Sequence, residues 1–369
     1  MIRILAIIAA LLFAAPAFAI DAPVLDSAVA SPSAIATTRA ALINNAYGIS
    51  TGKLPTTQPT VTQGVSDPWG GSLGVSLLRV DQYASTLGHG QTNVGFVYYP
   101  TAWNGNYISF SPGHIETCNW PSASSGYQLK QALVALLTAG YAVFTTNMPN
   151  SAPGVDNCGD TGVHVTLFQT YGDSAMQLFY DPIVQAMNYW DAHGGRGYYG
   201  MTGLSGGGWT TNSIAAVDPR VLVSVSIAGW LPGIVFNGTS PTGCGVGAPD
   251  GEQQAVDYFT IAGYLDEAMM GATGAGRAYV QILNVNDNCC FGPAQFTTCA
   301  TQYGESWYQY TNAYFRQMQS WGVPNSFNLV WDYVAIQHQI SSFAAALAVT
   351  TFNTYLHAPP TGVGVLAAH

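Results

Sequence analysis

The fold is decided by residues 197–209, which read GYYGMTGLSGGGW. Residues 197–202 predict a short strand, and residues 206–217 predict a helix that stops before Asp218-Pro219. Between them, Gly203-Leu-Ser-Gly-Gly207 has the pattern G-x-S-x-G in a strand–turn–helix setting. Glycines two positions before and after the serine leave no Cβ where the strand and the helix must approach closely.

The serine in this pattern, Ser205, is expected on a sharp turn that lifts its hydroxyl above the sheet. A helix that starts at Gly206 places backbone N–H groups beside an oxyanion that develops there. The motif therefore predicts a nucleophilic serine. The alternative is a turn without chemistry, because Gly and Ser recur in turns.

Outward from this turn, short apolar strands alternate with helices. Strands are expected at residues 73–86, 92–100, 107–111, 141–146, 197–202, 221–227, 279–285 and 327–334. Helices are expected at residues 33–47, 127–138, 172–193, 206–217, 306–321 and 339–355. The alternation predicts an α/β fold with a mostly parallel eight-stranded sheet, two antiparallel strands at its start and helices on both faces. Ligands of such sheets bind at the carboxyl ends of the strands.

With this motif and strand order, residues 73–357 resemble the α/β-hydrolase superfamily of serine hydrolases. That family places its catalytic groups in the order Ser, acid, His along the chain. The resemblance implies that Asp287, after the strand 279–285, is the acid and that His338, after the strand 327–334, is the base. A serine hydroxyl needs an imidazole to take its proton and a carboxylate to orient that imidazole.

Other residues compete for these roles. For the acid they are Asp257, Asp266, Glu267 and Asp332, and for the base His357 and His369. None of them occupies the family's usual loop at a strand end.

The resemblance also implies an oxyanion hole. One donor is the backbone N–H of Gly206, and the second is that of His114 or Ile115, in the loop after the strand 107–111. This loop has Pro112-Gly113 where the family more usually has His-Gly. The His114 side chain is expected to bind substrate or to order the loop.

The N-terminus predicts export. Residues 1–19 combine a basic start, an apolar run too short to span a bilayer, and Ala17-Phe-Ala19, which predicts a signal peptide cleaved after Ala19. The rest of the chain is expected to contain an N-terminal extension at 20–72, a catalytic domain at 73–357 and a tail at 358–369. A cap-like insertion is expected within the domain, at 229–277. No later segment predicts a membrane span.

The composition argues against a nucleic-acid partner. Only 8% of the residues are charged, and the net charge is −10, whereas about 25% charged residues is usual. Because acidic residues outnumber basic ones, we expect no basic surface of the kind that binds nucleic-acid phosphates. Hydrophobic residues make up 48% of the chain, which excludes a disordered chain.

The six cysteines fit an oxidising compartment. They are Cys118, Cys158, Cys244, Cys289, Cys290 and Cys299. A Cys118–Cys158 bridge is expected because both follow loops at the catalytic edge. Adjacent cysteines are strained partners, so Cys289 and Cys290 are each expected to pair elsewhere. No C-x-x-C or H-x-x-x-H spacing indicates zinc.

Three aromatic residues are candidates for an acyl pocket or for the core. Trp209 lies at the start of the helix 206–217, Trp230 follows the strand 221–227, and Phe291 follows the candidate acid Asp287. The resemblance implies a secreted serine hydrolase that cleaves carboxylic esters through an acyl-enzyme, with no metal or organic cofactor. Its substrate is a small, polysaccharide-linked or polymeric ester. The alternatives are a peptidase or amidase of the same fold, or a catalytically silent binding protein.

Overall fold

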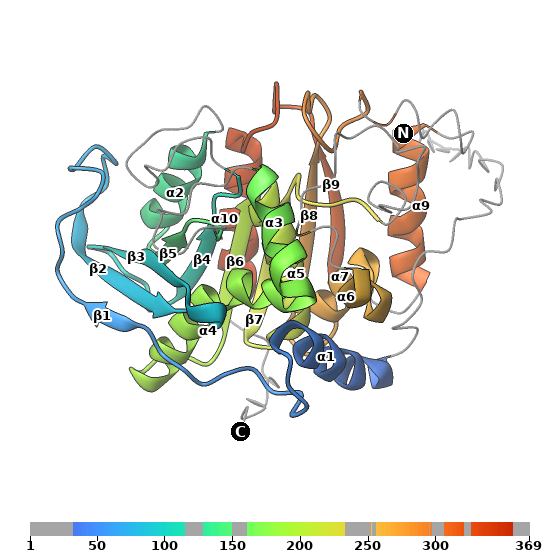
Figure 1. The fold of residues 1–369 in the computed structure, drawn as a ribbon. Coiled ribbons are helices and arrows are strands. Elements are labelled where there is room, and N and C mark those ends of the chain that lie inside the picture. The colour runs from blue at the N-terminus through green and yellow to red at the C-terminus, as the bar shows by residue number, and fades with distance from the viewer. Residues whose placement is uncertain are drawn as a thin grey trace, which may run out of the picture.

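The structure is a computed structural model of the chain. It describes residues 32–114, 128–149, 161–232, 252, 256–294, 296, 306–320 and 326–356. Figure 1 shows a central sheet with helices packed in front of it and behind it. The signal peptide, the tail and residues 233–251 of the insertion lie outside the described residues.

The described strands form one sheet in the order β1-β2-β3-β5-β4-β6-β7-β8-β9. The strands are β1 (Thr60–Thr62), β2 (Leu77–Thr86), β3 (Thr92–Pro100), β4 (Tyr107–Ser111), β5 (Ala142–Thr146), β6 (Tyr199–Leu204), β7 (Val221–Ile227), β8 (Ala278–Asn284) and β9 (Phe327–Asp332). Strands β1, β2 and β3 pair antiparallel, and β3 pairs antiparallel with β5. All pairs from β5 to β9 are parallel.

The mostly parallel sheet and its antiparallel start are confirmed, but the strand count is wrong. The structure has nine strands rather than the expected eight. The additional one is β1, in which Thr60 to Thr62 pair with Ala84 to Gln82 of β2. Three residues are too few to give a pattern of alternation, so this edge strand exists only through its pairing.

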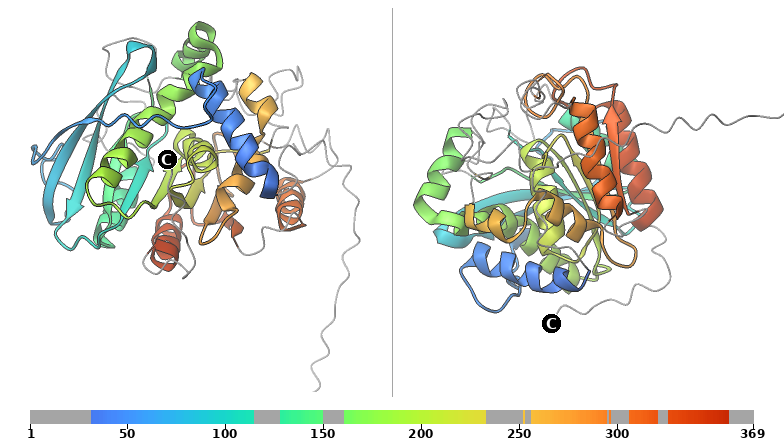
Figure 2. Two further views of the ribbon diagram at one scale, coloured as in Figure 1. Left: turned by 90° about the horizontal axis from the view of Figure 1, so that it is seen from below. Right: turned by 90° about the vertical axis from the view of Figure 1, so that its right-hand side faces the viewer.

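Helices cover both faces of the sheet. They are α1 (Pro32–Tyr47), α2 (Leu129–Thr138), α3 (Thr161–Tyr171), α4 (Met176–Ala192), α5 (Gly206–Val217), α6 (Val256–Ile261), α7 (Tyr264–Ala272), α9 (Trp307–Ser320) and α10 (Ser342–Leu356), with short 3-10 turns at Gly88–Gly90 and Gly172–Ala175. Helices α2 and α10 pack together on one face, and α4 and α5 cover the other, with α1 outside them. Figure 2 shows this separation from below.

The insertion at 229–277, expected to be cap-like, contains the helices α6 and α7 in its described part. Helix α7 packs on α5 and β8, and all of its residues are buried. This part of the segment therefore belongs to the helical layer that covers the sheet.

Helix α1 is an integral part of the fold. Leu42, Ile43 and Ala46 are buried on one side of it, and the Arg39 guanidinium donates to the carbonyl oxygen of Ala216 at the end of α5. The segment expected as an N-terminal extension is thus joined to the helices that cover the sheet by burial and by a hydrogen bond.

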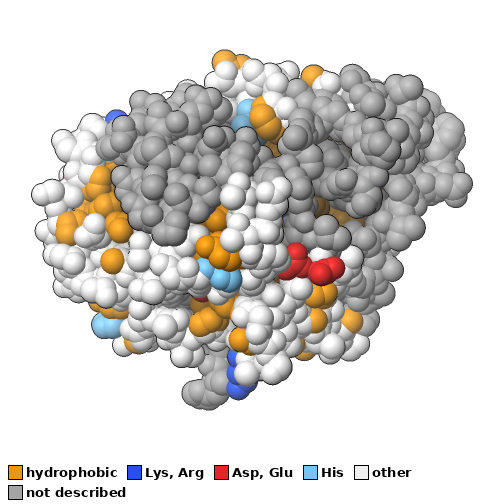
Figure 3. Space-filling view, viewed as in Figure 1, with side chains coloured by type: hydrophobic (Ala, Val, Ile, Leu, Met, Phe, Trp, Pro, Cys, Tyr) orange, Lys and Arg blue, Asp and Glu red, His pale blue; other side chains and the backbone are white. Residues whose placement is uncertain are grey.

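The surface is poor in charge. On the face of Figure 3 the described surface is largely uncharged, with the acidic side chains gathered in one small group. Among the described helices, none is both long and apolar enough to cross a bilayer.

Candidate active site

Ser205 occupies a strained turn between β6 and α5. Its backbone has φ 57° and ψ −127°, a conformation that L-residues rarely adopt. A Cβ on Gly203 would stand 2.4 Å from the carbonyl oxygen of Ser111, and one on Gly207 would stand 2.1 Å from the same atom. The two glycines of the motif are therefore required by the close approach of β4 to the turn.

Helix α5 begins directly after this serine. The N–H of Trp209 donates to the carbonyl oxygen of Ser205 at 2.9 Å, which closes the first turn of the helix. The N–H groups of its earlier residues, including Gly206, have no partner within the helix by the rule for helix starts. These donors and the helix dipole favour a negative charge beside Ser205.

Asp287 follows β8 and contacts the buried imidazole of His338. Its Oδ2 lies 2.7 Å from Nδ1 of His338, and its Oδ1 accepts the backbone N–H groups of Cys289 and Cys290 at 2.8 and 2.9 Å. Burial acts to raise the pKa of Asp287. The hydrogen bond and charge of His338, together with the two N–H groups, outweigh it and hold that pKa below its ordinary value.

Asparagines join the loop after β8 to the loop after β9. Asn284 Nδ2 donates to the carbonyl oxygen of Gln339 at 2.8 Å, and Asn286 Nδ2 donates to that of Ala335 at 3.0 Å. Asn288 Oδ1 accepts the backbone N–H of His338 at 3.2 Å. These residues were not predicted from the sequence. The alternating asparagines around Asp287, in Asn-Val-Asn-Asp-Asn, were the available signal.

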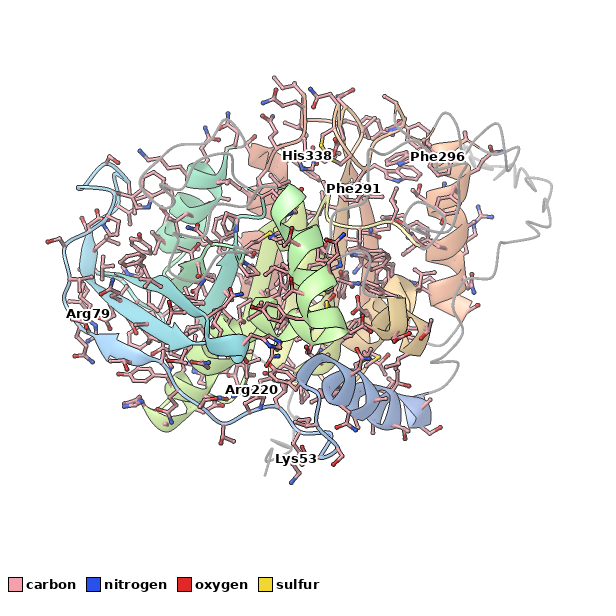
Figure 4. All side chains as sticks on the ribbon, viewed as in Figure 1. Lys53, Arg79, Arg220, Phe291, Phe296 and His338 are labelled. Atoms are coloured by element: carbon pink, nitrogen blue, oxygen red, sulfur yellow. A yellow bond between two sulfur atoms is a disulfide. The ribbon has the colours of Figure 1, made fainter. Side chains whose placement is uncertain are left out.

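The parallel strands bring these groups to one edge of the sheet. Strands β6, β7, β8 and β9 are successive parallel neighbours, so the residues that follow their carboxyl ends share that edge. Ser205 follows β6, Asp287 follows β8 and His338 follows β9. Figure 4 shows His338 above the ends of β8 and β9 with Phe291 beside it.

The rival acids have other surroundings. Asp332 accepts the N–H groups of Val334 and Ala335 and the hydroxyl of Ser341, so it shapes the turn after β9. Asp266 accepts the N–H of Gly263 at the start of α7, and Glu267 is buried in the same helix. Asp257 is exposed. His357 and His369 lie outside the described residues.

The loop after β4 packs directly on the serine turn. Gly113 has φ +80°, and a Cβ there would stand 3.3 Å from the nitrogen of Gly206. A Cβ on Gly206 would stand 2.8 Å from Nδ1 of the His114 ring. The loop expected to supply the second oxyanion donor thus touches the residue that supplies the first. Ile115 lies outside the described residues.

A second cluster of titratable groups lies behind that loop. His114 Nε2 is 3.1 Å from His164 Nδ1 and 3.3 Å from Glu252 Oε1, and His164 Nδ1 is 2.8 Å from Glu252 Oε2. Burial acts to raise the pKa of Glu252, but the two imidazoles outweigh it and hold that pKa below its ordinary value. No sequence pattern predicts this cluster, because His114 and His164 are 50 positions apart and His164 and Glu252 are 88 positions apart.

The vicinal cysteines correct a prediction. Cys289 and Cys290 are bonded to each other, with Cα atoms 3.7 Å apart, so the expectation that each pairs elsewhere is wrong. Both N–H groups point to Asp287 Oδ1, so the chain turns around that oxygen and brings the two side chains together. Their sulfur atoms are thus unavailable as thiolate ligands, although they stand near Asp287 and His338. The other four cysteines lie outside the described residues.

The three aromatic side chains expected near a pocket differ in their surroundings. Trp209 and Trp230 have no exposed surface, and the Trp230 indole N–H donates to the hydroxyl of Tyr279 at 2.8 Å. The ring of Phe291 lies 6.2 Å from the ring of His338. A role in a pocket remains a prediction for all three, and it is favoured for Phe291 by its place beside His338.

Known proteins resemble the chain in structure rather than in sequence. Neither a protein-family model nor a curated protein matches the sequence. A methylesterase superposes with a TM-score of 0.55 at 12% identity, over 90% of this chain and 66% of its own. The chain therefore spans just under two thirds of that protein's length. An esterase of Pyrococcus furiosus gives 0.50 at 12% identity, over 81% of this chain and 100% of its own. At such identities the likeness shows the fold alone.

Proposed function

We propose that this chain, which has the α/β-hydrolase fold, is a secreted serine hydrolase that cleaves carboxylic esters through an acyl-enzyme. The observation that carries the proposal is the turn at Ser205. There the backbone holds φ 57°, at a cost of about 1–3 kcal/mol for a residue in a sparsely populated region. Such strain persists where the surrounding structure enforces it, and it presents the serine side chain at the sheet edge.

In the proposed reaction, Ser205 attacks the ester carbonyl carbon while Nε2 of His338 takes the hydroxyl proton. The tetrahedral intermediate collapses, and His338 gives that proton to the leaving alcohol, which leaves an acyl group on Ser205. Water then attacks the acyl-enzyme with His338 as the base, and the acid and free Ser205 are released.

Asp287 supports this role of His338. A carboxylate 2.7 Å from Nδ1 fixes the proton of the neutral imidazole on that nitrogen and leaves Nε2 as the base. It also stabilises the imidazolium that forms during the attack. The backbone donors on Asp287 keep its other oxygen in place.

The negative charge on the carbonyl oxygen would be stabilised by backbone N–H groups. Gly206, at the start of α5, is the first donor. The second donor is His114 or Ile115, because the loop after β4 packs against Gly206.

A neutral or apolar ester is the proposed substrate class. The loop that leads to His338 exposes apolar side chains, with Tyr333 61%, Val334 51% and Ile336 76% exposed. The chain has only 9 Lys and Arg residues, so strong attraction of an anionic substrate is not expected. The two solved structures described above are an esterase and a methylesterase by name.

Secretion is part of the proposal and rests on residues 1–19. If the chain is exported by its natural host, N-terminal sequencing of the exported form should begin at Ile20. A mature protein that retains residues 1–19 would contradict a cleaved signal peptide.

The first test is labelling with a fluorophosphonate, which reacts with an activated serine. We expect the wild type to be labelled and to hydrolyse p-nitrophenyl acyl esters. Ser205→Ala should lose the label and at least about 10⁴-fold of kcat. The matched control Ser72→Ala, at an exposed serine, should retain both.

The same preparation should be assayed on p-nitroanilide peptides. Hydrolysis of the anilides with a kcat/KM above that for every ester tested would replace the ester proposal with a peptidase or amidase. If the folded wild type is neither labelled nor active on any of these substrates, the proposal of a hydrolase is wrong, and a catalytically silent binding protein replaces it.

A further inference from the structure

We propose that His114, His164 and Glu252 bind one divalent transition-metal ion of the zinc type. The three residues come from the loop after β4, from α3 and from the segment before α6. Each offers one ligand atom, and these atoms lie within 4.8 Å of one another. The binding itself does not depend on the proposed ester hydrolysis.

The spacing of the ligand atoms fits a metal ion. Zinc–nitrogen and zinc–oxygen bonds of about 2.0–2.2 Å in a tetrahedron place neighbouring ligand atoms about 3.3–3.5 Å apart. His114 Nε2 lies 3.1 Å from His164 Nδ1 and 3.3 Å from Glu252 Oε1. Glu252 faces His164 through its other carboxylate oxygen, because Oε2 lies 2.8 Å from His164 Nδ1. A zinc ion bound between His164 and Glu252 would require their ligand atoms to move apart to about 3.3–3.5 Å.

The hydrogen bonds of His164 call for a cation at Nδ1. Its Nε2 lies 3.0 Å from the carbonyl oxygen of Pro149, and its Nδ1 faces a carboxylate oxygen of Glu252. Both ring nitrogens thus face acceptors, while a neutral imidazole carries only one N–H. With the proton on Nε2 for the Pro149 carbonyl, the lone pair of Nδ1 faces a carboxylate oxygen of Glu252 at 2.8 Å as well as Nε2 of His114 at 3.1 Å. A second proton or a metal ion at Nδ1 removes the repulsion between this lone pair and the carboxylate. A metal-bound histidine whose other nitrogen donates to a backbone carbonyl is the usual arrangement.

Burial strengthens the case for a full positive charge. The side chains of His164 and Glu252 are 0% exposed and that of His114 is 12% exposed. A buried carboxylate is costly unless it is paired or binds a metal. Within the described part of the chain, the ion pairs of Glu252 are with these two imidazoles and with no Lys or Arg. Two imidazoles and one carboxylate suit zinc and its neighbours better than Mg²⁺, which prefers oxygen ligands.

The site adjoins the proposed oxyanion hole. The His114 ring that would coordinate through Nε2 has its Nδ1 edge against Gly206. A bound ion would therefore fix the loop of Gly113 and His114 on the start of α5. This consequence for catalysis rests on the proposed function, whereas metal binding does not.

The experiment is equilibrium dialysis of tag-free protein against Zn²⁺ after removal of metals with a chelator, with metal measured by mass spectrometry. We expect about one Zn²⁺ per chain, a rise in Tm on adding Zn²⁺, and no such rise with Mg²⁺. Glu252→Gln and His164→Gln should each weaken Zn²⁺ binding at least ten-fold. His193→Gln, which removes an exposed imidazole elsewhere, should bind as the wild type does.

The same dialysis should be done in the Ser205→Ala background, where one Zn²⁺ is again expected. Because His164 is fully buried, circular dichroism checks that its variant is folded, and His114→Gln replaces that variant if it fails to fold. The proposal is overturned if the wild type binds no Zn²⁺, or if its binding is unchanged in the folded cluster variants. Fluorophosphonate labelling of Ser205 does not depend on Zn²⁺ binding. The metal-site proposal and the ester-hydrolase proposal can therefore be refuted independently.

Discussion

Two buried aspartates near the carboxyl ends of neighbouring strands have different partners. Asp287 faces the imidazole of His338 at 2.7 Å. Asp332 accepts the backbone N–H groups of Val334 and Ala335. The first arrangement can orient a base, whereas the second fixes a turn. This difference in partners separates the candidate acid from its rival at the scale of single residues.

Asp287→Asn should lower kcat for ester hydrolysis by about 10⁴-fold, because the amide favours the wrong tautomer of the imidazole. KM should change little, since the carboxylate does not touch the substrate. Steady-state kinetics on p-nitrophenyl esters measures both.

Asp332→Asn serves as the matched control. It should lower Tm, because it weakens the hydrogen bonds of a buried turn, and it should leave kcat within about ten-fold of the wild type. If Asp332→Asn removes catalysis and Asp287→Asn does not, the assignment of the acid is wrong.

At the scale of elements, α5 and α7 meet around a buried carboxyl group. Glu267 of α7 accepts hydrogen bonds from Asn212 and Ser213 of α5, and from the hydroxyl of Tyr258. Tyr180 of α4 donates in turn to that hydroxyl at 2.7 Å. The contact that supports the helix after Ser205 is therefore partly polar.

Burial raises the pKa of Glu267 from 4.5 to about 8, despite the opposing hydrogen bonds from Ser213, Tyr258 and Asn212. The folded state thus holds a proton that the unfolded state releases above pH about 4.5. The free energy of unfolding that this group contributes is therefore largest below that pH and falls as the pH rises towards 8.

Glu267→Gln should flatten this dependence, because the amide does not titrate. Urea denaturation at pH 5, 6, 7 and 8 should show the wild type losing stability relative to the variant as the pH rises. The exposed control Asp257→Asn should follow the wild type. A constant difference between the wild type and Glu267→Gln over this range would contradict a raised pKa.

At the scale of the whole molecule, the first described helix closes the outer layer on one face. Leu42 of α1 is 0% exposed, and α1 contacts α4, α5 and α6. A segment that precedes the sheet in the sequence is therefore part of the same hydrophobic core. Figure 2 shows α1 lying across the helices on this side.

Leu42→Ala should reduce the free energy of unfolding by about 2–5 kcal/mol, because it leaves a cavity in a packed core. Thr37→Ala, on the exposed side of the same helix, should change it by no more than about 0.5 kcal/mol. Urea denaturation of both variants provides the measurement. Equal losses would mean that α1 does not share the core.

The order of the main elements and the need for glycine at the central turn can be read from the sequence alone. Periodic apolar runs and Gly and Pro stops placed β2 to β9, although not β1, because local patterns report local conformation. The G-x-S-x-G motif needs glycine where Ser111 approaches the backbone of Gly203 and Gly207, and that constraint can be read from adjacent positions. Asp287 and His338 were predicted from their places after strands.

Which distant groups meet depends on the three-dimensional packing and cannot be read from the sequence. The bond between Cys289 and Cys290 depends on how the chain turns around Asp287. The cluster of His114, His164 and Glu252 joins residues up to 138 positions apart in the chain, and no local spacing connects them. Such contacts follow from packing of the sheet, the loop after β4 and α3, and packing is a property of the whole chain rather than of any short stretch of it.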